Sequence, residues 1–209
     1  MIALCLFNEA RPAPHLPDLV IDRVPLVDAL AQWNYPLWLA AYFPVALWLW
    51  RRDRSLFVHF LYVGGLLTLL RGLCVNLTGL GPVTGGDVNA GLAFAQGWAA
   101  WWSIVNPLTA FGDATHVMLS KDLFFSGHTA TTFLLYLYAR REPGLGTAAL
   151  LAHVVTVAVV VLSHLHYTID IVGAWAITYC IYRVTTERWP PKASFPSQSM
   201  RGAASVGPP

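Results

Sequence analysis

The stretch from residue 146 to residue 163, GTAALLAHVVTVAVVVLS, has no charged side chain in eighteen consecutive positions. An apolar run of this length is about what an α-helix needs to cross the hydrocarbon core of a membrane. The whole chain is similar in character, because 56% of its 209 residues are hydrophobic and only 11% are charged. An average soluble domain has about 25% charged residues. The composition therefore excludes a disordered chain and favours an integral membrane protein over an ordinary soluble domain.

Four further apolar runs are long enough, alone or with their neighbours, to form membrane-spanning helices. They are Trp33–Trp50, Leu56–Leu77, Phe124–Ala139 and Thr168–Val184. We therefore predict an all-α, multi-pass membrane helical bundle with five spans. The stretch Gly91–Phe111 is also apolar but includes Gln96 and Pro107. We expect it to form a helix at the membrane interface, with a sixth span as the alternative.

The distribution of basic residues predicts the orientation of the five spans. Nine of the thirteen Lys and Arg residues fall on one side if the spans alternate, and the positive-inside rule assigns that side to the cytoplasm. Residues 1–31 are then an outer N-terminal segment, 32–186 a transmembrane catalytic domain, and 187–209 a disordered cytoplasmic tail rich in Pro, Ser and Gly. The N-terminus starts outside with no span before it. We therefore expect that an upstream helix is missing or that the start is misplaced.

Charge and cysteine content argue against two other classes of function. The formal net charge is only +2, which gives no electrostatic support to a nucleic-acid partner. The three cysteines, Cys5, Cys74 and Cys180, are scattered and odd in number. They indicate neither a disulfide framework nor a zinc site, and we interpret them as packing residues.

Two short segments at the predicted outer face carry the side chains best suited to chemistry. Residues 125–129 read FSGHT, and residues 164–170 read HLHYTID. His166 and Asp170 are four residues apart and share one face if a helix has begun there. A carboxylate in that place can hold one ring nitrogen of His166 and leave the other as a nucleophile or base. Ionisable residues at membrane depth indicate function by default.

Other interpretations of the same residues remain open at this point. His166 and Asp170 could form a structural pair at the interface, with His128 a lone polar residue, in a protein that binds lipid or scaffolds a complex without catalysis. A zinc site of His128, His164, His166 and Asp170 is disfavoured, because no cysteine lies near and the spacing matches no helical zinc motif. His153 lies within a predicted span, and we expect it to be a hydrogen-bonded packing residue.

Several motifs follow one another in a recognisable order. They are HLPD at 15–18, Leu70-Arg71, SGHT at 126–129, VLSHLH at 161–166 and HYTID at 166–170. Over residues 8–186 this order resembles the sphingomyelin synthase family, a branch of the type 2 phosphatidic acid phosphatase superfamily. The resemblance implies a six-span fold with both termini in the cytosol. This chain would then lack the first span.

The resemblance also implies phosphoryl transfer through a phosphohistidine. His166 would attack the phosphorus of a phospholipid head group, phosphocholine or phosphoethanolamine, while Asp170 orients it. His128 would protonate the departing diacylglycerol and then deprotonate the acceptor, ceramide or a diacylglycerol-type lipid alcohol. The alternative is a lipid phosphatase or phospholipase C-like hydrolase, in which water accepts the phosphoryl group.

Further residues are expected to bind the substrate. They are Arg71, Lys121, Asp122, Ser126, Gly127, His164 and Tyr167. An arginine inside a span needs an anionic partner, although Arg71 could instead snorkel to the outer interface. Lys121-Asp122 stands where the family has Gly-Asp, and Val160 stands where the superfamily's phosphatases have Arg. We expect no metal and no cofactor, and the sequence leaves a homo-oligomer open.

Overall fold

The computed structural model of the chain describes residues 2–87, 89–105, 119–142 and 144–191. All regular structure in these ranges is helical. The α-helices are α1 (Ile2–Ala10), α2 (Asn34–Arg52), α3 (Arg54–Thr78), α4 (Phe94–Val105), α5 (Gly127–Ala139), α6 (Leu145–Leu162) and α7 (Thr168–Arg188), with short 3-10 helices at Ile21–Arg23 and Asp28–Trp33. The predicted disordered tail after residue 191 and the end of the predicted interfacial stretch lie outside the described residues. The all-helical class is confirmed.

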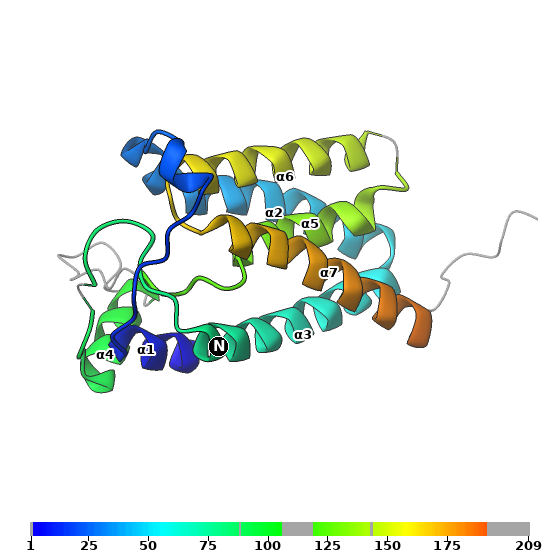
Figure 1. Cartoon of the computed structure of the whole chain (residues 1–209). Helices are drawn as coiled ribbons and strands as arrows, with labels where there is room; N and C mark the ends of the chain where they lie inside the picture. The colour runs from blue at the N-terminus through cyan, green and yellow to red at the C-terminus, as the bar shows by residue number, and fades with distance from the viewer. Residues whose placement is uncertain (1, 88, 106–118, 143, 192–209) are drawn as a thin grey trace, which may run out of the picture.

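Five helices, α2, α3, α5, α6 and α7, run side by side as a bundle (Figure 1). We call one end of it the loop end, because residues 11–33, 79–87, 89–93, 119–126 and 163–167 lie between helices there. Helices α2, α5 and α7 begin at the loop end, and α1 and α4 lie beside it (Figure 1). We call the opposite end the basic end. Seven arginines gather there, at positions 51, 52, 54, 140, 141, 183 and 188.

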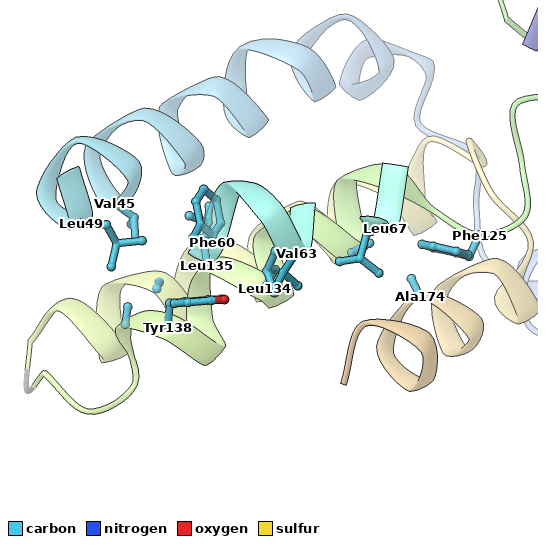
Figure 2. Close-up of a cluster of buried hydrophobic side chains, with 13 residues drawn as sticks. Val45, Leu49, Phe60, Val63, Leu67, Phe125, Leu134, Leu135, Tyr138 and Ala174 are labelled. Carbon is cyan, nitrogen blue, oxygen red and sulfur yellow. The ribbon is translucent and has the colours of Figure 1, made fainter. Parts of the chain in front are cut away.

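Helix α5 is the centre of the bundle and contacts α2, α3, α6 and α7. Its Leu134, Leu135 and Tyr138 are buried among apolar side chains of the surrounding helices, as Figure 2 shows. His153 of α6 links three helices by hydrogen bonds. Its ring bonds Thr132 Oγ1 on α5 at 2.8 Å and accepts from Trp175 Nε1 on α7 at 2.9 Å. The prediction of a hydrogen-bonded packing role for His153 is confirmed.

Two of the described helices, α3 and α6, are long and apolar enough to cross a membrane, judged by length and composition. Their outward faces keep large apolar side chains exposed, among them Leu69 and Leu77 of α3 and Leu151 of α6. Such faces are typical of helices that contact lipid. Helix α5, with 13 residues, is only about 20 Å long and is shorter than the hydrocarbon core. These features indicate a membrane location, and the five-span arrangement stays a prediction.

Candidate active site

The His166–Asp170 pair lies at the start of α7. Asp170 is fully buried, and its Oδ2 accepts a hydrogen bond from the Tyr167 amide at 2.9 Å, which caps the first turn of the helix. The same oxygen lies 3.3 Å from Nδ1 of His166, whose side chain is 6% exposed. Because Asp170 holds Nδ1, Nε2 is the ring nitrogen of His166 left for chemistry.

The N-terminal segment holds this first turn in place. Asp18 accepts hydrogen bonds from the Thr168 amide at 2.6 Å and from the Thr168 hydroxyl at 2.8 Å. It also accepts from the amides of Val20 and Ile21. Burial opposes the charge of Asp18, but the hydrogen bonds, led by that of the Thr168 amide, outweigh it and hold the pKa of Asp18 below its ordinary value. Asp18 is thus an ionised brace for α7.

Tyr167 has a bracing position as well, although the sequence suggested substrate binding. Its side chain is buried, and its hydroxyl bonds the Leu16 amide, the carbonyl oxygens of Gly81 and Pro82, and the His15 ring. Burial raises the pKa of Tyr167, so the phenol stays neutral. The hydroxyl therefore ties two loops to the turn that presents His166.

His128 and His166 line the same cavity. Ser126 begins α5 by accepting a hydrogen bond from the Thr129 amide, so His128 lies in the first turn of the helix. The cavity has a volume of about 390 Å³. It is lined by Asn34, Tyr35, Trp38, Thr68, Arg71, Leu119, Asp122, Gly127, His128, Thr131, Leu165 and His166.

Arg71 forms part of the cavity wall with its guanidinium held firmly. Its Nε donates to the Phe125 carbonyl at 2.6 Å, and its Nη1 lies 2.8 Å from Asp122 Oδ1. The side chain is 13% exposed, so Arg71 is paired inside the protein and does not extend to the interface. A Cβ added to Gly127 would lie 3.2 Å from Arg71 Cζ, which explains the glycine before His128.

Four of the expected substrate-binding residues do not line the cavity, namely Tyr167, described above, and Lys121, His164 and Ser126. Lys121 is completely buried, and its Nζ bonds Asp87 and the carbonyl oxygens of Glu9 and Arg11, each at 2.6 Å. His164 bonds the Val24 carbonyl oxygen through Nε2 at 3.0 Å. The structure gives both residues anchoring contacts to the N-terminal segment. Ser126, also expected to bind substrate, is buried as the cap of α5.

Sequence reasoning missed Asn34 and Trp38 of α2. The Asn34 amide nitrogen lies 3.2 Å from His128 Nε2, and the Trp38 ring meets the His128 ring edge-on at 5.8 Å between centroids. The two residues are one helical turn apart, at the start of the first predicted span. An Asn and a Trp in that place look like ordinary interfacial residues, so only their position one turn apart could have suggested a shared contact.

A metal centre has no support in the described part of the chain. Among residues 2–87, 89–105, 119–142 and 144–191, no three His, Cys, Asp or Glu side chains are arranged to hold a metal ion.

Comparison with known families supports the wider group. Residues 121–187 match the family model described as PAP2 superfamily C-terminal. The match supports the type 2 phosphatidic acid phosphatase superfamily and phosphatase- or phosphotransferase-type chemistry on lipids, without reaching the sphingomyelin synthase branch. The matched segment contains His128, His166 and Asp170. A comparison of the whole chain with curated proteins gave no match.

Proposed function

We propose that this protein is a membrane enzyme that transfers a phospholipid head group to a lipid hydroxyl through a phosphohistidine on His166. One observation carries the proposal: His128 and His166 line one cavity, with Asp170 buried behind His166 and Arg71 in the cavity wall. Two histidines with distinct supports are what a two-step transfer with one nucleophile and one acid–base group needs. The PAP2 match supports the chemical class, and the transfer to ceramide is our proposal.

In the first step, Nε2 of His166 attacks the phosphorus of the donor. The bond from phosphorus to the diacylglycerol oxygen breaks, and protonated His128 gives its proton to that oxygen. Asp170 fixes the ring of His166 and stabilises the positive charge that the ring gains on attack. Diacylglycerol then leaves, and the head group stays bound to His166 as a phosphoramidate.

In the second step, His128 accepts the proton of the acceptor hydroxyl as that oxygen attacks the phosphorus. The nitrogen–phosphorus bond breaks, and both histidines return to their starting states. The head group, phosphocholine or phosphoethanolamine, is then on ceramide or a similar lipid alcohol. Protons and phosphoryl groups balance over the cycle without a cofactor.

The local electrostatics favour a phosphoryl anion in this cavity. Asn34 and Gly127 are the first residues of α2 and α5, and both line the cavity, while His166 comes two residues before α7. Three helix N-termini, each with partial positive charge, thus lie at the cavity. Arg71 adds a full charge in the wall, partly offset by Asp122. These groups together can stabilise charge on the transferring phosphoryl oxygens.

The charge distribution supports an orientation with the cavity facing the periplasm, a lumen or the exterior. The seven arginines of the basic end lie opposite the loop end. The positive-inside rule places such a cluster in the cytoplasm. The loop end, with the cavity, then faces the other side.

Hydrolysis is the second candidate, because the matched superfamily is named for phosphatases. Water would replace the lipid hydroxyl in the second step. The same residues would act, and only the acceptor would differ.

The test uses the purified full chain in liposomes that contain head-group-labelled phosphatidylcholine, with and without ceramide. Mass spectrometry measures the ceramide that carries the phosphocholine head group and the released head group. We expect His166→Ala and His128→Ala to abolish product. His59→Gln, a buried histidine on α3 toward the basic end, is the matched control and should keep activity.

Each outcome of this test decides between the candidates. Equal product from wild type and His166→Ala would contradict the mechanism. Released head group that does not depend on ceramide would favour hydrolysis. A covalent head-group adduct on the peptide that carries His166 would support the phosphohistidine.

A further inference from the structure

The strongest unassigned feature of the cavity is the contact between α2 and His128. The Asn34 amide nitrogen lies 3.2 Å from His128 Nε2. One turn later, Trp38 covers the edge of the same ring and donates from Nε1 to Thr131 Oγ1 on α5 at 2.7 Å. These contacts come from α2, which lies outside the segment that matches the PAP2 model. Helix α2 therefore holds the His128 ring from one side.

This contact separates the roles of the two ring nitrogens of His128. Nε2 is bonded to Asn34, whereas Nδ1 makes no hydrogen bond to any residue that the structure describes. The His128 ring lines the cavity. Nδ1 is consequently the nitrogen left to exchange a proton with a substrate oxygen.

A carboxamide can serve both protonation states of a histidine. Its nitrogen donates to a neutral ring nitrogen, and its oxygen, after rotation of the amide, accepts from a protonated one. Asn34 Oδ1 is buried and has no hydrogen-bond partner among the described residues, so no neighbour there fixes the amide in one orientation. The amide is thus able to turn its oxygen toward a protonated Nε2.

We propose that Asn34 is a positioning residue whose amide oxygen, after rotation of the amide, accepts from His128 Nε2–H in both steps, so that Nδ1 carries the proton to and from the substrate. The inference rests on the proposed function. In the first step the Asn34 oxygen accepts from Nε2–H while Nδ1–H protonates the departing oxygen. His128 is left neutral with its proton on Nε2, and Nδ1 is free to take the acceptor's proton in the second step.

Other ionisable groups also face His128 and set the background for a pH test. They are His166 before α7, Arg71 of α3 and Asp122 before α5. The α2 residues in contact with the ring, Asn34 and Trp38, are uncharged. Replacing Asn34 by an acid therefore adds one new charge next to Nε2 and leaves the other three groups in place.

The experiment compares variants of the full chain in liposomes by the pH profile of kcat/KM for the donor phospholipid. Asn34→Leu, similar in size but unable to hydrogen-bond, should lower kcat about 10- to 100-fold, with less change in KM. The loss is smaller than the roughly 10²- to 10⁴-fold of a whole acid–base contribution, because His128 itself remains. Asn34→Asp should shift the alkaline limb, where His128 loses its proton, upward by about one pH unit or more, because a carboxylate stabilises the imidazolium.

The control is Thr78→Asp, which adds the same charge at an exposed position of the loop end outside the cavity. Its alkaline limb should stay in place. A merely structural role of Asn34 would move the unfolding temperature but not this limb. Wild-type kcat in Asn34→Leu, or an unshifted limb in active Asn34→Asp, overturns the inference.

Failure of the proposed function looks different from failure of this inference. If the proposed function fails, wild type and His166→Ala give the same result. If only the inference fails, wild type is active and His166→Ala is not, while the Asn34 variants behave like wild type. If Asn34→Leu does not fold, the profile of Asn34→Asp decides alone.

Discussion

Asp170→Asn removes one negative charge from behind His166 and leaves the shape of the site almost unchanged. The amide oxygen can still accept from the Tyr167 amide, so we expect the first turn of α7 to form. The positive charge that His166 gains on attack loses a partner 3.3 Å away. At an effective dielectric constant of about 20, two opposite charges at that distance interact by about 5 kcal/mol. A loss of this size corresponds to a fall in kcat of roughly 10³- to 10⁴-fold.

The assay measures kcat for transfer of the labelled head group to the acceptor lipid in liposomes, together with the unfolding temperature of each variant in detergent. Asp170→Asn should keep an unfolding temperature close to that of wild type, whereas Asp170→Ala should lose both activity and stability, because it removes the cap of α7. A kcat of Asp170→Asn within tenfold of wild type, in a folded protein, would refute the role given to this carboxylate.

Three further variants test other parts of the site. Gly127→Ala should lower kcat/KM about tenfold, because the new Cβ must displace the Arg71 guanidinium. Its unfolding temperature should not fall, because Ala favours helix more than Gly does. A kcat/KM equal to that of wild type would contradict this prediction. Asp18→Asn should lower the unfolding temperature at pH 7, because the ionised Asp18 side chain, bonded to Thr168, stabilises the fold above the unfolded pKa of about 3.9. The difference in unfolding temperature between wild type and variant should shrink as the pH falls through the lowered pKa of Asp18 in the folded protein. A difference that stays constant with pH would contradict the role given to Asp18. Lys121→Met should lower the free energy of unfolding by roughly 3–5 kcal/mol and speed hydrogen exchange in α1, because a buried ion pair loses one partner. A lower kcat/KM with unchanged hydrogen exchange would instead favour the phosphate-binding role that the sequence suggested.

The sequence predicted the helical class and the contact between His166 and Asp170 because their signals are local. A run without charge, such as 146–163, has to be buried or in lipid, and it forms α6 almost within its predicted bounds. The four-residue spacing of His166 and Asp170 likewise predicts a shared side, and the structure has them 3.3 Å apart. Periodicity and spacing are enough for such features.

The sequence could not predict which polar residues face the cavity. Lys121 comes just before the SGHT motif and looked suited to phosphate, but its partners Glu9, Arg11 and Asp87 are 34 to 112 positions away in the chain. Asn34 shows the reverse, since nothing near it in sequence indicates a histidine 94 positions later. Such contacts depend on how helices pack, and local pattern carries no signal for them.

The brace between Asp18 and Thr168 has a consequence for biosynthesis. The two residues are 150 positions apart, and Asn8 likewise waits for the carbonyl of a residue 113 positions later. At about 5–20 residues per second, the ribosome makes Thr168 roughly 8 to 30 s after Asp18. During that interval the hydrogen bonds between Asp18 and Thr168 cannot form. The active site is therefore completed only when α7 emerges. A nascent chain that stalls before α7 contains Asp18 but not Thr168, so the brace cannot form.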